Sequence, residues 1–191
     1  MQKLARELKK TLRKELIEKR RAMDESYKKA ADLDIFEQLK PFADKASAVF
    51  TYASAPIEVD TRKLIGYCIG KNIPIALPRS GDTELAFYYI NNPYDLAPGR
   101  FNIDEPPADR PAFPDENTLC IVPALCADGE GYRLGYGRGY YDRFLEGFNG
   151  ISIIICYSIF KMSRMEIPTE PHDVKALYTL FNRDNLTETP L

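Results

Sequence analysis

The stretch RLGYGRGYYDRFL, residues 133–145, has glycines at 135, 137 and 139 and leads into apolar residues at helical spacing. It follows an apolar run, residues 119–122, that is closed by Pro123. Glycine allows positive φ and brings bare backbone N–H groups against a ligand, which is how anion-binding concavities form. A strand, a glycine loop and a helix N-terminus in this order therefore predict an anion site.

The loop matches neither of the common phosphate-loop patterns. A P-loop needs Lys and then Ser or Thr after its last glycine, and GxGxxG needs a glycine where Tyr140 stands. The glycines alone leave a surface turn before a helix as an equal interpretation. Arg133, Arg138 and Arg143 favour the anion site, because guanidinium groups donate in pairs to phosphate oxygens.

Asp142 lies next to this loop, where a bound phosphate would repel it unless a divalent cation lies between them. Proteins commonly hold Mg²⁺ in this way, with one or two carboxylates plus the substrate phosphates. A carboxylate that is stabilised by the helix dipole is the alternative interpretation, and the residues alone give both equal weight.

Apolar periodicity indicates an α/β fold along the whole chain. We expect one domain, residues 1–191, with a three-layer, Rossmann-like architecture: a largely parallel central sheet with helices on both faces. Residues 151–156 form a continuous apolar run, which is typical of a strand covered on both faces. Asp24 is the expected cap of the second helix and Pro41 its stop. Helices are expected over residues 1–23, 24–39, 61–70 and 140–148, and strands over 47–53, 73–77, 84–90, 119–122, 151–156 and 177–181.

The composition is that of an ordinary soluble globular protein of 191 residues, with 45% hydrophobic and 28% charged residues and a net charge of −2. This balance provides no general attraction to nucleic acid or to a membrane, and no apolar run is long enough to span one. The charged N-terminus lacks a signal sequence, so we expect a cytoplasmic protein. The four cysteines form no CxxC pair, which favours buried thiols in a reducing compartment. Cys126 could be accessible, although a small loop residue is favoured over a nucleophile.

The N-terminal helix has leucines at every fourth position, Leu4 to Leu16, and nine basic against three acidic residues between Lys3 and Arg21. Such a run is usually a solvated helix face and less often an RNA-binding patch. Lys9 and Arg13 lie one turn apart, a spacing that suits two oxygens of a polyphosphate.

The glycine stretch resembles the signature of the 5-formyltetrahydrofolate cyclo-ligase family, whose usual form is close to RLGYGGGYYDRFL. Four other segments resemble that family in the same order and together span nearly the whole chain. They are KKTLRKELIEKRRAM (9–23), PIEVDTRKLI (56–65), PGRFNIDEPP (98–107) and EPHDVK (170–175).

The resemblance implies an enzyme that converts 5-formyltetrahydrofolate and ATP to 5,10-methenyltetrahydrofolate, ADP and phosphate with Mg²⁺. It implies small-molecule substrates for a monomer, with no nucleic acid or membrane partner. Arg138 and Tyr140 are the implied catalytic residues, and Asp142 and Asp173 the implied metal ligands. The implied folate contacts are Ala53, Glu58, Tyr136, Gly137, Arg138, Gly139 and Tyr140. The implied ATP contacts are Lys9, Lys10, Thr11, Leu12, Arg13, Arg133, Leu134, Gly135, Tyr136, Gly137, Arg138, Gly139, Tyr140 and Tyr141.

Four other positions bear on the site. Glu58 follows a strand end, where open α/β sheets bind ligands, and its carboxylate could accept paired N–H groups of a pterin. His172, the only histidine, is favoured as a loop residue over a general base. Ala127 and Leu177 depart from the family pattern, and they put the detail of the C-terminal pocket in doubt.

Two other function classes compete with the ligase. A phosphosugar isomerase or CoA-transferase relative would explain the glycine loop but not Lys9 with Arg13 or the paired acids, and it would turn over without ATP. A non-enzymatic RNA-binding module would rest on the basic N-terminal helix alone, and the balanced total charge argues against it.

Overall fold

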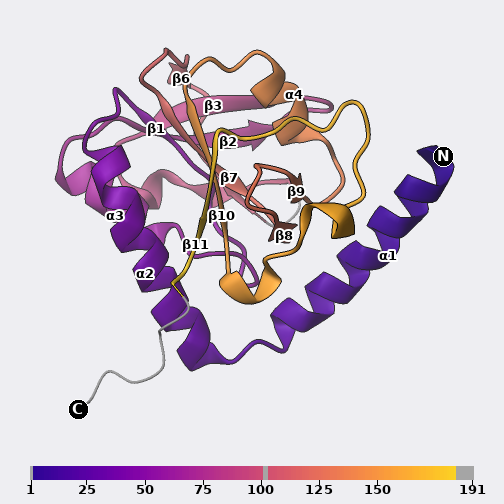
Figure 1. Cartoon of the computed structure of the whole chain (residues 1–191). Coiled ribbons are helices and arrows are strands. Elements are labelled where there is room, and N and C mark those ends of the chain that lie inside the picture. Colours follow the sequence, from indigo (N-terminus) through magenta and orange to yellow (C-terminus); the bar gives the residue numbers. More distant parts are fainter. Residues whose placement is uncertain (1, 101–102, 184–191) are drawn as a thin grey trace.

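The computed structural model describes residues 2–100 and 103–183, which form a seven-stranded sheet with helices around it (Figure 1). The strand order is β11-β10-β7-β1-β2-β3-β6. In chain order these strands are β1 (Val49–Phe50), β2 (Ile75–Ser80), β3 (Leu85–Ile90), β6 (Pro111–Ala112), β7 (Leu119–Pro123), β10 (Ile151–Cys156) and β11 (Tyr178–Phe181). The helices are α1 (Gln2–Arg21), α2 (Glu25–Ala43), α3 (Arg62–Gly70) and α4 (Tyr140–Glu146).

The five strands from β11 to β2 are parallel, and β3 and β6 are antiparallel additions at one edge. The crossover β1–α3–β2 moves along the sheet in one direction, and β7–α4–β10 moves in the other. Because such crossovers are right-handed, α3 and α4 lie on opposite faces. The predicted three-layer, largely parallel α/β fold is confirmed.

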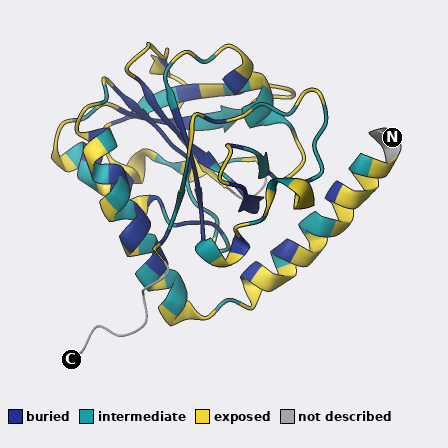
Figure 2. Cartoon of the chain, viewed as in Figure 1, coloured by how far each residue is buried: buried dark blue, intermediate teal, exposed yellow. Residues whose placement is uncertain are grey.

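The sheet core is built from continuous apolar strands. Ile153 and Ile154 of β10 have no exposed surface, and β10 lies between β7 and β11, as a strand covered on both faces should. Phe50 of β1 stacks on Phe87 of β3 at 4.6 Å between ring centroids, and Phe144 of α4 packs on Phe87 at 4.8 Å. These rings hold α4 against its face of the sheet. Figure 2 shows the buried strands surrounded by half-buried helices.

Several predicted boundaries differ from the structure. Pro41 does not stop α2, which continues to Ala43; proline lacks an N–H donor, but a helix that ends two residues later loses little by this. Asp24 caps α2 as predicted, accepting from the N–H groups of Ser26 and Tyr27 at 2.9 Å. Strand β2 continues through Pro78, where a stop was expected.

Several short elements lie between the main strands and helices in the described part of the chain. The sequence did not predict the hairpin of β8 (Cys126–Ala127) and β9 (Arg133–Leu134), because two-residue strands give no periodic signal. The described residues between β3 and β7, 91–100 and 103–118, contain β4 (Ala97–Pro98), β5 (Asp104–Glu105), β6 and the 3₁₀ turn Pro93–Asp95. Two further 3₁₀ turns, Ser158–Phe160 and Arg164–Glu166, follow β10.

Helix α1 packs against the body of the protein through only part of its length. Leu16 is buried, but Leu4 and Leu8 are 65% and 50% exposed, so the predicted leucine stripe is not a continuous core face. The N-terminal half of α1 projects beyond the sheet, and most of its surface is exposed (Figures 1 and 2). Two basic residues of this helix, Lys9 and Arg20, are buried instead.

The neighbouring strands β1 and β7 are the point where the strand order reverses direction. In open α/β sheets, ligands bind outside the carboxyl ends of the strands at such a switch point. The segment that contains Glu58 follows β1 and the glycine loop comes after β7, so both reach this crevice. Within residues 2–100 and 103–183, no helix is both long and apolar enough to span a membrane.

Candidate functional site

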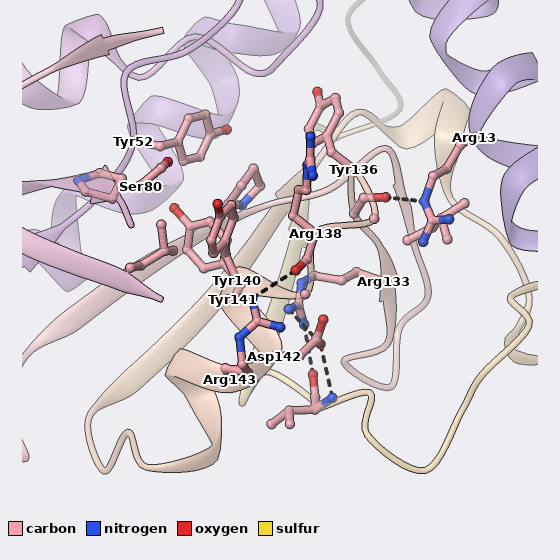
Figure 3. Close-up of a pocket in the computed structure, with 18 of the residues that line it drawn as sticks. Arg13, Tyr52, Ser80, Arg133, Tyr136, Arg138, Tyr140, Tyr141, Asp142 and Arg143 are labelled. Atoms are coloured by element: carbon pink, nitrogen blue, oxygen red, sulfur yellow. Dashed lines mark hydrogen bonds and ion pairs between the residues drawn. The ribbon is translucent and has the colours of Figure 1, made fainter. Parts of the chain in front are cut away.

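A cavity of about 1000 Å³ opens at the carboxyl ends of β1 and β7 (Figure 3). Its walls come from α1, the segment after β1, the glycine loop with α4, the β5 region and residues 170–174. Every residue predicted to bind ATP, folate or metal lines this cavity except Lys10, Thr11 and Leu12. Lys10 and Thr11 lie on the exposed face of α1, and Leu12 packs against the core.

The glycine loop uses two positive φ angles, +93° at Gly137 and +67° at Gly139, immediately before α4. The position that a Cβ of Gly137 would take lies 3.1 Å from the Arg13 guanidinium carbon. Arg13 Nε also donates to the Gly135 carbonyl at 2.8 Å. The loop is therefore shaped to pass close to an arginine of α1, and a side chain at 137 would disturb that contact.

Two of the predicted phosphate-binding arginines are already bound to protein acceptors. Arg133 donates to Asp142 at 3.0 Å and to the Val174 carbonyl at 2.8 Å, and its side chain is 5% exposed. Arg143 donates to the Thr83 carbonyl at 2.5 Å and to the Arg138 carbonyl at 2.9 Å. Arg133 thus joins α4 to residues 170–174, which we call the C-terminal loop. Its position in the sequence did not reveal this role.

The predicted polyphosphate contact Lys9 lies among carboxylates. Its Nζ is 2.8 and 2.7 Å from the two Asp173 oxygens and 3.0 Å from Glu170 Oε2. The hydrogen bond from Lys9 lowers the pKa of Glu170 below its usual value. Arg6 also donates to Glu170, at 3.1 Å. Helix α1 and the C-terminal loop are therefore joined by a small ionic network.

The same network contains a set of possible cation ligands. Side-chain ligand atoms of Glu170, His172 and Asp173 lie within 4.8 Å of one another, and Asp142 is not a member of that cluster. Both Arg133 and the Val174 N–H donate to Asp142 Oδ1. Carboxylates that border one cavity are the oxygen ligands that Mg²⁺ prefers, so the donor set fits this ion.

Glu58 is a buried carboxylate that lines the same cavity from the segment after β1. It is 7% exposed, and its Oε2 accepts from the Ala55 N–H at 2.7 Å. Burial raises the pKa of Glu58, while the Ala55 N–H, the Tyr136 hydroxyl and the charge of Arg20 oppose the rise. A desolvated carboxylate with such partners is suited to accept N–H groups from a planar ligand.

Three tyrosines complete the cavity wall. Tyr140 donates to the Gly81 carbonyl at 2.9 Å. Burial raises the pKa of both Tyr136 and Tyr141, so both hydroxyls are protonated donors. The buried Tyr141 hydroxyl has no hydrogen-bond partner among the described residues. Such a group favours a polar ligand in the cavity.

None of the four cysteines lines the cavity. Cys126 is fully buried and burial raises its pKa to about 12, so the interpretation as an accessible nucleophile is wrong. Tyr52 and Glu170 are among the cavity-lining residues to which the sequence analysis gave no role. Its place in the family-like segment EPHDVK, three residues before Asp173, was the available signal for Glu170.

Comparisons with known proteins point to one family. Residues 5–179 match the model of the 5-formyltetrahydrofolate cyclo-ligase family. A 5-formyltetrahydrofolate cyclo-ligase of Mycolicibacterium smegmatis is 37% identical over 46% of this chain and 46% of its own length. The mitochondrial 5-formyltetrahydrofolate cyclo-ligase of Arabidopsis thaliana is 27% identical over 86% of this chain and 69% of its own length. The chain therefore spans less than half the length of the mycobacterial relative.

One solved structure extends the similarity to three dimensions. The 5,10-methenyltetrahydrofolate synthetase of Aquifex aeolicus superposes with a TM-score of 0.81 at 29% identity. The superposition covers 93% of this chain and 91% of that protein.

Proposed function

Because the chain belongs to the 5-formyltetrahydrofolate cyclo-ligase family, we propose that it converts 5-formyltetrahydrofolate and ATP to 5,10-methenyltetrahydrofolate, ADP and phosphate. The observation that carries this proposal is the division of one cavity into two chemically different ends. A buried carboxylate, Glu58, forms one end, and the ionic network of Lys9 and Asp173 forms the other. The glycine loop borders the same space: its Tyr136 hydroxyl hydrogen-bonds to Glu58, and its Gly135 carbonyl accepts from Arg13 of α1.

The folate end is assigned to Glu58 and Ala53. A pterin ring carries adjacent N–H donors, and Glu58 can accept them because an ionised carboxylate has about four acceptor sites, of which the Ala55 N–H and the Tyr136 hydroxyl use two. Burial in a low-dielectric wall strengthens such hydrogen bonds. Tyr136 and Tyr140 offer ring faces and hydroxyls to the substrate at the middle of the cavity.

The nucleotide end is assigned to Lys9, Arg13 and the backbone of the glycine loop. The spacing of Lys9 and Arg13 puts two cationic side chains on one face of α1, and both line the cavity. Residues 135–139 have no bulky side chain at three of five positions, so phosphate oxygens can approach their N–H groups. Lys10, Thr11 and Leu12, which do not line the cavity, would affect ATP only through the position of α1.

Phosphoryl transfer explains why these two ends must meet. An N-formyl group is a poor electrophile, and its oxygen is a poor leaving group. When the formyl oxygen attacks the γ-phosphorus, the bond to ADP breaks and an activated carbon results. The folate N10 then attacks that carbon, the C–O bond breaks, phosphate departs and N10 loses its proton. Arg138 and Tyr140, beside the reacting groups, would orient them and stabilise charge.

Mg²⁺ fits the carboxylates at the nucleotide end. Asp142 and Asp173 would hold it, and Glu170 is the third carboxylate nearby. When bound, the ion neutralises phosphate charge. Lys9 now bonds to Asp173 and Glu170, so its ammonium would exchange these partners for phosphate oxygens.

The mixture of protein, 5-formyltetrahydrofolate, ATP and Mg²⁺ should produce the near-ultraviolet absorbance of the methenyl product. Omitting ATP, or removing Mg²⁺ with a chelator, should abolish the signal, because ATP and Mg²⁺ are both needed for phosphoryl transfer. Turnover without ATP would favour an isomerase or transferase instead. If the protein binds ATP but forms no product, the assignment of the nucleotide end stands and 5-formyltetrahydrofolate is rejected as the substrate.

We infer that the chain acts as a monomer on small molecules in the cytoplasm. The four free, buried cysteines support a reducing compartment. RNA binding by α1 has little support, since Lys9 and Arg20 of its basic run are turned into the protein.

A further inference from the structure

Arg20, in the last turn of α1, is a buried cation that the proposed reaction does not use. It is 3% exposed and does not line the cavity. No ion pair joins it to a carboxylate within residues 2–100 and 103–183. Its guanidinium donates to carbonyl oxygens instead, and lies 4.7 Å from the ring centroid of Phe160 and 5.3 Å from that of Tyr157. Burying a charge is costly even when its N–H donors are satisfied. We therefore expect a role of Arg20 in the groups that it contacts.

One of the carbonyls that accept from Arg20 belongs to a residue that lines the cavity, Ile57, and the other two belong to the segment that follows β7. Arg20 Nη1 donates to Ile57 at 2.8 Å, the residue immediately before Glu58. Nη2 donates to Ala124 at 2.8 Å, and Nε and Nη2 donate to Leu125 at 3.1 and 3.0 Å. Ala124 and Leu125 follow β7 directly and lead towards the glycine loop. One guanidinium therefore joins the chain segments that leave the two switch-point strands.

The same face of α1 reaches the other end of the cavity. Lys9, Arg13 and Arg20 are separated by four and seven residues, which places them within about 40° of one another around the helix. They contact, in turn, the C-terminal loop, the glycine loop and the Ile57 carbonyl. One face of helix α1 therefore contacts both the nucleotide end and the folate end.

We propose that Arg20 is a positioning residue that sets the place and charge of Glu58, and so controls folate binding. This inference rests on the proposed function. Arg20 acts through the Ile57 carbonyl, which fixes the backbone before Glu58, and through its charge, which favours an ionised Glu58. The other titratable groups that interact with Glu58 are the hydroxyls of Tyr52 after β1, Tyr136 in the glycine loop and Tyr141 in α4, and the Ala55 N–H donates to its carboxylate.

Lysine cannot replace this arginine. The guanidinium spreads its donors over three nitrogens in a plane and reaches three carbonyls on two segments. An ammonium is a compact point charge, so Arg20→Lys keeps the charge but holds at most one of the two segments well. Arg20→Met removes both the charge and the hydrogen bonds. The pair separates the geometric effect from the electrostatic one.

The test measures KM for each substrate in Arg20→Lys and Arg20→Met, with Arg21→Met as the matched control. Arg21 is the next residue of α1, is 64% exposed and pairs only with Glu18 in the described chain, so its loss should leave both KM values unchanged. We expect KM for 5-formyltetrahydrofolate to rise roughly tenfold or more in both Arg20 variants. KM for ATP should change less than about twofold. Equal rises for both substrates would mean a general structural role and overturn the proposal.

A double-mutant cycle with Glu58→Gln tests whether Arg20 acts through Glu58. Calorimetric titration with 5-formyltetrahydrofolate should show that Arg20→Lys weakens binding strongly in the wild-type background and little in Glu58→Gln. Independent, additive losses would refute the coupling. Arg20→Met should also move the pH at which folate binding is lost upward, because a Glu58 without its cation keeps its proton longer. Arg20→Lys, which retains the charge, should not.

A variant that unfolds is recognised by thermal unfolding before any titration. If Arg20→Met does not fold, Arg20→Lys carries the same KM comparison and the same cycle. Wild-type protein that neither binds 5-formyltetrahydrofolate nor forms product would reject the proposed function itself. Active wild-type protein with an unchanged folate KM in Arg20→Lys would reject only the role of Arg20.

Discussion

Gly137 is the position at which one methyl group should most sharply test the shape of the glycine loop. Its φ of +93° is a conformation that L-residues rarely adopt. Alanine there costs about 1–2 kcal/mol of backbone strain. The new Cβ would lie 3.1 Å from the Arg13 guanidinium carbon and 3.2 Å from its Nε, so Arg13 must move by a few tenths of an ångström.

The strain translates into a measurable loss of stability. For a domain of this size, each kcal/mol lowers Tm by roughly 2–4 °C, so Gly137→Ala should lower Tm by about 2–8 °C. Moving Arg13 also disturbs its 2.8 Å bond to the Gly135 carbonyl and should weaken ATP binding. Thermal unfolding followed by circular dichroism gives the first effect, and calorimetric titration with ATP gives the second.

Gly135→Ala is the matched control for stability. Gly135 has no positive φ, and no atom lies within 4 Å of its would-be Cβ. Its replacement should therefore leave Tm nearly unchanged, or raise it slightly by restricting the unfolded chain. Equal melting temperatures for the two variants would refute the reasoning from φ and from the approach of Arg13.

Three other perturbations test separate parts of the site. Asp142→Asn should abolish Mg²⁺-dependent turnover while Tm changes little, since the amide oxygen can still accept from Arg133; unchanged turnover would remove Asp142 from the metal site. The four cysteine thiols should resist a thiol reagent at pH 8 until the protein is denatured, because burial raises the pKa of Cys126 to about 12; rapid labelling of native protein would contradict this burial. Glu58→Gln should stabilise the protein at pH 7 relative to wild type while weakening folate binding. The folded-state pKa of Glu58 lies above its unfolded value of 4.5, so the folded state holds the proton more tightly and wild-type stability falls as pH rises through that interval. The stability difference between the two proteins should therefore shrink below pH 4.5, and a constant difference between pH 4 and pH 7 would refute the assignment.

Much of the fold was predictable because its elements give strong local signals. The apolar run of β10 and the alternation of strands with helices indicated a parallel sheet, and Asp24 marked the start of α2. Pro41 misled the prediction, since a proline near the end of a helix removes one donor without ending the helix. The hairpin of β8 and β9 was missed because two-residue strands have no periodicity.

Most of the residues predicted for the site line the cavity, but their mutual contacts were not predictable. The resemblance named Lys9, Glu58 and Asp142, and all three line one cavity. It did not foresee that Arg133 is bound to Asp142, or that Lys9 bonds to Asp173. Those contacts join residues 9 and 164 positions apart, and no local pattern records which side chains the chain brings together.

The sequence by itself determined the α/β class and the glycine loop, because hydrophobic period and glycine conformation are properties of neighbouring residues. Only the tertiary structure decided what the basic residues of α1 do. By sequence, Arg20 and Arg21 are equivalent members of a charged run, yet one is buried against three carbonyls and the other is exposed. The difference follows from the 100° between successive residues of a helix and from the side of α1 that faces the sheet. That side is fixed only when the whole chain has folded.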